Sequence, residues 1–285
     1  MEMWQSWLNA RDSKSRIRAT VSGVRTPPSP PEKILMRQKY RFLYHLLNLI
    51  PCKTERLHKL LDLLRFYYKQ NNLQIVCADG SIINNPIKIP NFLYLKTYGD
   101  ASDNTVIIPY NCEQGSNIRL EFHGACTNTL KFGTGNMIVM TAYIQGANGK
   151  MNIGNNNYIV GSILYFYCSG TTTFTLGNGN LFSDNIIFWA GEGHCMINPT
   201  TRDITNAGGN ICIGNDNWIC MNTCFLKRAN IGNGCVIGYG SVVGKDFSNE
   251  DSCVIAGNPA IIAKKDILWA ETAPWNYKGE VYRNK

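Results

Sequence analysis

Apolar residues return at every sixth position through the C-terminal half of the chain. The run consists of Ile213, Ile219, Phe225, Ile231, Ile237 and Val243. This spacing fits neither the 3.6-residue period of an α-helix nor the two-residue alternation of a β-strand. It fits a coil of three short flat faces, in which each face turns one apolar side chain into a narrow core.

Glycine follows the apolar residue at four of these positions, namely Gly214, Gly232, Gly238 and Gly244. Glycine suits a corner at which a Cβ atom would obstruct the backbone. The pattern therefore predicts a mainly β protein, a left-handed parallel β-helix built from hexapeptide repeats. The asparagines of the turns are expected to take left-handed corner conformations; they are Asn155, Asn178, Asn215 and Asn233.

Pairs of an apolar residue and a glycine mark the start of five coils. They are Phe132-Gly133, Ile153-Gly154, Leu176-Gly177, Ile213-Gly214 and Ile231-Gly232. The last interval equals three repeats of six and is taken as one complete turn, and the first three intervals exceed it by 3, 5 and 19 positions. Stacked strands must stay in register, so an excess at one corner is expected to leave the stack as a loop. The largest excess predicts a protruding loop over residues 190–210.

Composition divides the chain into four predicted parts. These are a basic irregular leader and linker (1–31), an amphipathic helical segment (32–72), the β-helix (73–258) and a C-terminal tail (259–285). Two apolar stripes separated by Pro51 predict two helices. The first stripe contains Leu43, Leu46, Leu47 and Ile50, and the second contains Leu57, Leu60, Leu61, Leu64 and Tyr68. In the tail, Trp269 and Trp275 are expected to pack back over the body.

The net charge of +8 belongs to the N-terminal quarter. Positions 1–71 carry 14 Lys and Arg against 5 Asp and Glu, whereas the rest of the chain carries 14 against 15. The basic helices over residues 32–72 either dock on an anionic membrane surface or form a solvated hairpin that caps the β-helix or joins subunits. No aromatic-basic motif accompanies the charge, so nucleic acid is not an expected partner.

No apolar run reaches the length of about 18 residues that a membrane span needs. The eleven cysteines contain no CxxC pair, and several stand where a coil wants a small apolar residue. Reduced core thiols in a cytoplasmic protein are therefore expected, with neither disulfides nor a metal site. Peripheral contact of the helical segment with the inner face of the membrane is one alternative within this location.

The four histidines differ in their surroundings. His45 and His58 belong to the predicted helices, and His123 lies in an irregular early coil. His194 instead stands at the start of the predicted loop, in the segment Trp189-Ala-Gly-Glu-Gly-His194. Neutral imidazole can accept a proton near pH 7, which makes a histidine in this position a candidate general base.

Several segments accompany His194. Trp218 follows 24 positions later, then the glycine-rich coil over residues 236–243 and the segment Gly257-Asn-Pro-Ala260. Together they resemble the hexapeptide-repeat O-acetyltransferases, in particular the bacterial enzymes that acetylate sialic-acid capsules and other sugar chains. The resemblance covers about residues 153–269 and says little about residues 1–72.

The resemblance implies direct acetyl transfer from acetyl-CoA in a homotrimer whose grooves form between adjacent subunits. His194 would accept the proton of a sugar hydroxyl as its oxygen attacks the thioester. Glu192 either fixes the tautomer of the imidazole or is a turn residue that faces water. Trp218 would line the thioester site, or alternatively cap the core at a corner. The oxyanion donors would be backbone N–H groups of a coil corner.

The resemblance also assigns the acetyl-CoA groove. Its walls would contain Met221, Tyr239, Gly244 and Lys264, with Lys245 and Lys265 near the phosphates. Two positions depart from the family pattern. Ile261 stands where relatives commonly have a basic residue after Asn-Pro-Ala, and Tyr239 replaces a small residue, which either narrows the groove or stacks on the ligand.

The leading functional prediction is an acetyl-CoA-dependent O-acetyltransferase of a bacterial surface polysaccharide (capsule or O-antigen, sialic-acid polymers included) or its precursor. The nearest alternative is an N- or O-acyltransferase of a small acceptor such as a nucleotide-sugar or an amino acid. A non-catalytic β-helix scaffold is a further alternative. A γ-class carbonic anhydrase would need three histidines on a metal, and only His194 is well placed for one.

Overall fold

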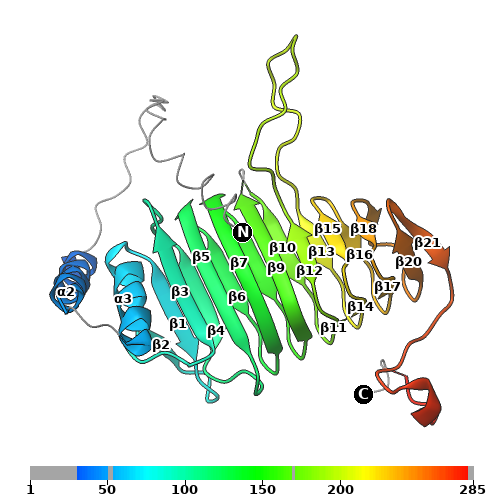
Figure 1. Cartoon of the computed structure of the whole chain (residues 1–285), viewed down its shortest axis with the longest axis horizontal. Helices are drawn as coiled ribbons and strands as arrows, with labels where there is room; N and C mark the ends of the chain where they lie inside the picture. Colours follow the sequence, from blue (N-terminus) through cyan, green and yellow to red (C-terminus); the bar gives the residue numbers. More distant parts are fainter. Residues whose placement is uncertain (1–30, 51–53, 169–170, 282–285) are drawn as a thin grey trace.

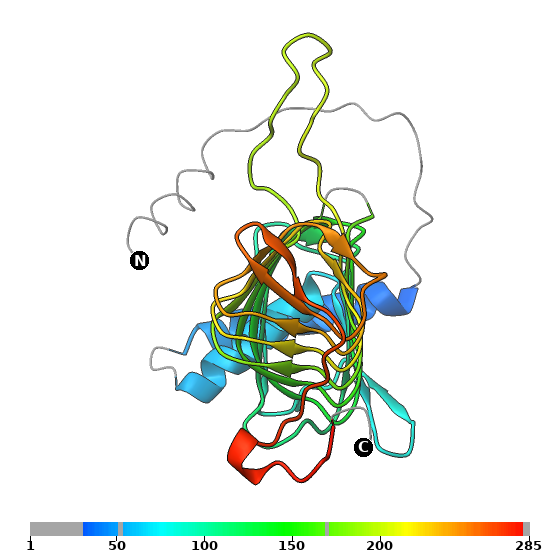
Figure 2. The ribbon, with the colours of Figure 1, turned by 90° about the vertical axis from the view of Figure 1, so that its right-hand side faces the viewer.

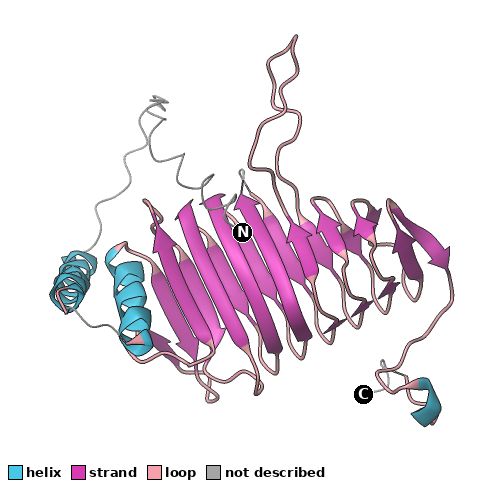
Figure 3. Ribbon diagram, in the orientation of Figure 1, coloured by secondary structure: helices cyan, strands magenta, loops and turns pink. Residues whose placement is uncertain are grey.

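The computed structural model describes residues 31–50, 54–168 and 171–281. Two helices, α2 (Pro31–Asn48) and α3 (Glu55–Tyr68), stand at one end of a long stack of strands (Figures 1 and 3). Viewed along the stack, the strands enclose a narrow core and one loop rises far above the body (Figure 2). The predicted leader, Pro31 apart, lies outside the described residues.

The coils distribute their strands over three faces. Face 1 contains β1 (Asn72–Val76), β4 (Thr105–Pro109), β6 (Thr129–Phe132), β8 (Lys150–Ile153), β10 (Thr173–Leu176), β13 (Ile211–Ile213), β16 (Asn230–Ile231) and β19 (Asp246–Phe247). Face 2 contains β11 (Leu181–Phe182), β14 (Trp218–Ile219), β17 (Val236–Ile237) and β20 (Val254–Gly257). Face 3 contains β12 (Ile186–Trp189), β15 (Cys224–Leu226) and β18 (Val242–Val243). Strands on each face pair in parallel, which confirms the predicted β-helix.

Long strands replace the separate strands of faces 2 and 3 in the N-terminal coils. β5 (Asn117–Cys126), β7 (Met137–Ala147) and β9 (Tyr158–Cys168) bend across both faces, and β3 (Leu93–Tyr98) pairs with β5. β9 pairs with β11 at Tyr158 and with β12 from Ser162 onward. Two antiparallel strands, β2 (Ile82–Asn84) and β21 (Ala260–Lys264), lie against β1 and β20.

In the described part of two coils, extra residues stay in the stack within β7 and β9, so the prediction that each excess leaves as a small loop is wrong there. The intervals with an excess of 3 and 5 positions contain β7 and β9, each 11 residues long. Their extra residues pair with each other, as Gln145 does with Tyr167. Neighbouring coils of similar length can therefore keep hydrogen bonds along a broader face. Among the described residues of these intervals, those that protrude belong to the largest excess.

The core follows the six-residue spacing. All six residues of the run from Ile213 to Val243 are buried, with at most 2% of their surface exposed. Aromatic rings fill the middle coils, where Phe188 and Phe225 stack with centroids 5.1 Å apart. The prediction that each face contributes an inward apolar side chain is confirmed.

The glycines at the corners leave room for the next coil. A Cβ atom at Gly214 would collide with the carbonyl oxygen of Gly232, and one at Gly177 would lie 2.6 Å from the carbonyl oxygen of Gly214. Gly244 differs, because the nearest atom to its Cβ would be Leu226 Cδ1 at 3.4 Å, an ordinary contact.

The corner asparagines do not take the predicted left-handed conformation. The next residue does so instead, with positive φ at Asn156, Gly179, Asp216 and Gly234. The side chains form ladders along the stack: Asn178 Oδ1 accepts the N–H of Asn155, and Asn215 Oδ1 accepts that of Asn178. A second, buried ladder joins Asn136, Asn157, Asn180 and Asn217. Both satisfy backbone groups that the turns leave unpaired.

The helical segment caps the first coil through α3. Leu61, Leu64 and Phe66 are buried, and the Phe66 ring packs 5.4 Å from that of Phe122. α2 packs on α3 through Tyr40 and Tyr67, whose ring centroids are 4.9 Å apart. The predicted apolar stripe of α2 is only partly covered; the large apolar residues exposed on α2 and just after it are Leu35, Phe42, Leu46, Leu49 and Ile50.

The C-terminal residues after β20 return as β21 and then run along the body. Trp269 is buried and its Nε1–H donates to the carbonyl oxygen of Asp216 at 2.9 Å. Trp275 is 84% exposed, so the prediction that both tryptophans pack on the body holds only for Trp269. None of the described helices is long and apolar enough to cross a membrane.

Candidate active site

The predicted loop of residues 190–210 leaves the stack at the corner between faces 3 and 1 (Figures 1 and 2). A Cβ at Gly191 would collide with the carbonyl oxygen of Tyr167, so glycine permits the departure. Gly209 N–H donates to the carbonyl of Ala190 at 3.3 Å and closes the neck. Beyond the neck, Ile197 and Ile204 form an antiparallel bridge. The loop is thus a hydrogen-bonded excursion with a defined base.

His194 lies near the base of this loop and is exposed. Its backbone is fixed by Asn206, which is 8% exposed. Asn206 Nδ2 donates to the carbonyl of His194 at 2.8 Å, and Asn206 Oδ1 accepts the N–H of Met196 at 2.7 Å. One carboxamide therefore holds both sides of the segment that carries the imidazole, while the ring remains accessible to a ligand.

Lys227 connects the loop to the next coil. Its Nζ donates to the carbonyl oxygen of Asn206 at 2.9 Å and lies 3.2 Å from Glu192 Oε1. Glu192 is thus part of an ion pair that anchors the neck. This contact gives Glu192 a positioning role beside the two predicted roles, and both of those stay predictions.

Two predicted acetyl-CoA residues share the corner of the loop. Gly244 and Lys245 lie between β18 and β19, two coils beyond the loop, and both are exposed. The small residue Gly244 packs under Leu226, which belongs to the intervening coil. The structure therefore brings His194, Gly244 and Lys245 to one edge of the stack.

The other predicted residues lie at different corners. Trp218 begins β14 on face 2, is 37% exposed, and packs against Trp269 with ring centroids 6.1 Å apart. Met221 and Tyr239 lie between faces 2 and 3, at 43% and 71% exposure. Asn222 Nδ2 donates to the Tyr239 hydroxyl at 2.6 Å, which fixes that ring outward. These residues cannot line one groove with His194 within a single prism.

The last two residues predicted to contact acetyl-CoA, Lys264 and Lys265, lie at the C-terminal end of the stack. Lys264 is the last residue of β21 and is exposed. Lys265 follows it and pairs with Glu250 at 3.0 Å. Hydrogen bonding and charge from Glu250 raise the pKa of the Lys265 ammonium above its ordinary value. Lys264 is therefore better placed to receive a phosphate than Lys265.

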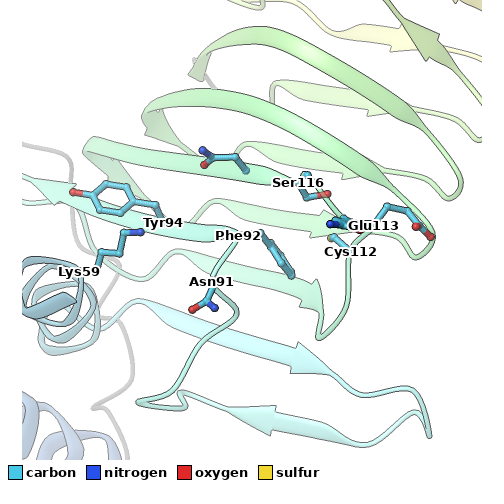
Figure 4. A pocket seen from close by; sticks show the side chains of 10 residues that line it. Lys59, Asn91, Phe92, Tyr94, Cys112, Glu113 and Ser116 are labelled. Carbon is cyan, nitrogen blue, oxygen red and sulfur yellow. The ribbon is translucent and has the colours of Figure 1, made fainter. Parts of the chain in front are cut away.

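Two pockets of about 330 Å³ lie away from the imidazole. The first lies between α3 and the first coils, with Lys59 and Tyr94 on one side and Cys112 and Glu113 on the other (Figure 4). The second lies at the neck of the loop and is lined by Thr171, Thr172, Gly208, Gly209, Asn210 and Arg228. None of the predicted site residues lines either pocket.

The cysteine thiols differ in how far they are buried. Every cysteine in the described part of the chain is free, and burial raises the pKa of the Cys168 thiol to about 12. Cys195, beside His194, is exposed. Among the described residues, no three His, Cys, Asp or Glu side chains gather in a way that could hold a metal ion.

Comparisons with known proteins agree with the coil architecture. A polysialic acid O-acetyltransferase of Escherichia coli O1:K1 / APEC is 28% identical over 98 residues, which are 34% of this chain and 31% of the relative. A chloramphenicol acetyltransferase of Klebsiella aerogenes is 37% identical over 84 residues, 27% of this chain and 39% of the relative. The predicted resemblance to the hexapeptide-repeat acetyltransferases is confirmed.

The hexapeptide-repeat acetyltransferase fold extends over most of the chain. The crystal structure of the polySia specific acetyltransferase NeuO superposes with a TM-score of 0.58 and 23% identity, covering 73% of this chain and 89% of that chain. The chain spans only about a third of the length of the curated relatives that it matches. No family model matches the chain.

Two residues of the candidate site were not predicted from the sequence. Asn206 and Lys227 position the His194 segment, yet neither belongs to a motif. The contact of Asn206 spans 12 residues inside an irregular loop, and Lys227 acts from the next coil. The only available signal was that both are polar residues at the corner where the excess residues leave the stack.

Proposed function

We propose that this protein is an acetyl-CoA-dependent O-acetyltransferase whose acceptor is a sugar hydroxyl of an anionic surface polysaccharide. The observation that carries the proposal is the exposed His194, held by its backbone at the base of the protruding loop, at the same corner as Gly244 and Lys245. The sequence relative that acetylates polysialic acid supports the choice of acceptor.

His194 is the proposed general base. The hydroxyl oxygen attacks the thioester carbonyl carbon, and its proton passes to the neutral imidazole in the same step. The carbon–sulfur bond then breaks, and the proton passes on to the departing thiolate. The products are the O-acetyl ester and CoA. Asn206 and Lys227 hold the backbone segment that carries the imidazole, which reduces the entropy that the reaction must lose.

The proposed active assembly is a homotrimer. His194, Trp218 and Tyr239 lie at three different corners of one prism, so a cleft containing them requires a neighbouring copy.

The test replaces the base and a neighbour on the same loop. We expect His194→Ala to lower the rate of CoA release with polysialic acid by roughly 10² to 10⁴. Cys195→Ala is the matched control: it is also exposed, and as the adjacent thiol it is the residue that a covalent route would use. Full activity in His194→Ala would refute the proposed base. Loss of activity in Cys195→Ala alone would replace direct transfer by a covalent mechanism.

The acceptor distinguishes the two enzymatic hypotheses. A polysaccharide acetyltransferase should favour long sialic-acid chains over monosaccharides in kcat/KM with acetyl-CoA. Turnover of a nucleotide-sugar or an amino acid at rates above those of the polymer would favour the small-acceptor alternative. No turnover with any acceptor, together with unchanged behaviour of His194→Ala, would favour the scaffold.

The proposed location is the cytoplasm, with α2 in contact with an anionic membrane surface. The exposed Leu35, Phe42 and Leu46 are accompanied by exposed Arg37 and Arg41. Apolar side chains beside cations suit the boundary of an anionic bilayer. The purified protein should co-sediment with phosphatidylglycerol vesicles at low salt, and Phe42→Ser with Leu46→Ser should abolish this. Equal sedimentation of the double variant would refute the contact.

A further inference from the structure

Three aromatic side chains form a column on the outside of face 3, hereafter the aromatic column. Tyr143, Tyr165 and Trp189 occupy the same register position in β7, β9 and β12. All three are half-buried on the outer side of strands whose alternate residues enter the core. The three strands lie side by side in Figure 1, and no residue of the described acetyl-transfer site belongs to the column.

The rings of the aromatic column hold one another in place. Tyr143 and Tyr165 stack with centroids 5.4 Å apart and an interplanar angle of 17°. Tyr165 and Trp189 lie 4.6 Å apart. Rings that are already ordered lose little conformational entropy when a ligand covers them. Because Tyr143 and Tyr165 are stacked, their π faces point toward each other and the column offers mainly ring edges outward, which carry partial positive charge and suit the oxygen atoms of an anionic sugar chain.

Charged groups lie at the N-terminal end of the aromatic column. Glu121 and Lys96 occupy the same register position in the two preceding coils. Glu121 contacts Arg119 and His123, and the His123 ring stacks on Tyr98 at 4.3 Å. Burial raises the pKa of the Glu121 carboxyl, but the hydrogen bonds from His123 and Arg119 outweigh it, so the pKa is lowered. The carboxylate is thus neutralised internally, and Lys96 remains to attract an anionic group.

The aromatic column leads to the catalytic loop. Trp189 is the last residue of β12, and the loop departs at the next residue. The carboxyl ends of β7, β9 and β12 lie along the edge from which the loop rises (Figure 1). From Lys96 to Trp189 the register crosses four strand spacings of about 4.8 Å, or about 19 Å, enough for several sugar residues.

We infer that the aromatic column and its charged end bind the acceptor chain, an anionic polysaccharide that packs against Tyr143, Tyr165 and Trp189 and extends toward Lys96 while its reacting residue lies at His194. This inference rests on the proposed function. It assigns the acceptor to the N-terminal coils, whereas the predicted acetyl-CoA residues all lie from β14 onward. The two substrates therefore approach the imidazole from opposite ends of the stack.

The test compares two tyrosines of the same strand. Tyr165→Ala removes the centre of the aromatic column, whereas Tyr158→Ala removes an outward tyrosine from the face 2 end of β9. Binding of polysialic acid to the full-length protein is measured by calorimetry without acetyl-CoA, and CoA release is measured separately with a long chain and with a monosaccharide. Tyr165→Phe is the conservative variant, because it retains the ring.

We expect Tyr165→Ala to weaken the binding of long chains about tenfold, the effect of about 1.4 kcal/mol, and to raise KM while leaving the monosaccharide rate unchanged. Tyr158→Ala and Tyr165→Phe should bind normally. Equal binding by Tyr165→Ala and the unaltered protein would overturn the inference. So would a loss of the oligomer in Tyr165→Ala, seen by light scattering, because the column would then be an interface between copies.

The two proposals fail in different ways. If His194→Ala keeps its activity while Tyr165→Ala loses binding, the proposed base is wrong and the acceptor-binding role of the aromatic column is supported. If His194→Ala is inactive and every tyrosine variant binds equally, the proposed function is supported and the acceptor-binding role of the aromatic column is wrong. Lys96→Met gives an independent check, because it should reduce binding of the anionic chain most strongly at low salt.

Discussion

The N-terminal and C-terminal coils have the same core and different surfaces. In the former, β7 and β9 are 11 residues long and carry outward aromatic rings. In the latter, strands such as β14 and β17 contain two residues each, separated by glycine corners. Yet Phe122 and Phe225 are both completely buried, so the inward side of every coil obeys one rule. The two regions therefore differ in their outer surfaces.

The difference depends on the neighbouring coil. Extra residues in β7 meet extra residues in β9 and pair with them, as Gln145 and Tyr167 do. The excess of 19 positions before β13 meets a following coil that has no excess to offer, so this segment leaves the stack. A shared excess therefore widens a face, and an isolated excess forms a loop. In this protein the widened face carries the aromatic column, the proposed acceptor site, and the loop carries the proposed base.

The largest expected effects come from the shared core. Phe122→Ala in a wide coil and Phe188→Ala in a narrow one should each lower the free energy of unfolding by about 3–5 kcal/mol, because both leave a cavity among rings. Denaturant unfolding followed by circular dichroism measures this. Ile83→Ala, on the exposed strand β2, is the control and should change little. A small cost for Phe122→Ala alone would show that the wide coils are not continuous with the core.

Much of this arrangement could be predicted from the sequence. The six-residue run located the inward residues, and the excess of 19 positions located the loop, because both depend on spacing along the chain. The pairing of the shorter excesses could not be predicted, since it depends on the relative lengths of β7 and β9. The corner asparagines were placed at the right turns with the wrong conformation, because their side chains stack between coils while the next residue turns.

In the candidate site, too, some residues could be predicted from the sequence and others could not. The roles of His194 and Trp218 were predicted by motif and spacing and stay predictions. Asn206 and Lys227 act through contacts across the loop neck that no spacing reveals. Their role follows only when the corner is built.

An intermediate effect should separate two glycines that look equivalent in the sequence. Gly214→Ala should lower the free energy of unfolding by about 1–3 kcal/mol, because its Cβ would collide with the carbonyl oxygen of Gly232 in the next coil. Gly244→Ala should change it by less than about 0.5 kcal/mol, since only the Leu226 side chain lies nearby. Chemical denaturation of both variants tests the comparison, and equal costs would mean that the narrow coils can move apart.

The smallest effect concerns the charged end of the widened face. Glu121→Gln should lower the free energy of unfolding by about 1 kcal/mol at pH 7, because it weakens the contacts with Arg119 and His123. The folded-state pKa of Glu121 is below its ordinary value of 4.5, so the carboxylate stabilises the fold fully above that pH. As the pH falls below 4.5, the unaltered protein loses this contribution.

Thermal unfolding of both proteins from pH 7 to pH 3 should therefore converge on acidification. Glu113→Gln, at an exposed position before the start of β5, should follow the unaltered protein throughout. If the gap between Glu121→Gln and the unaltered protein stayed constant with pH, Glu121 would contribute by packing and not by charge.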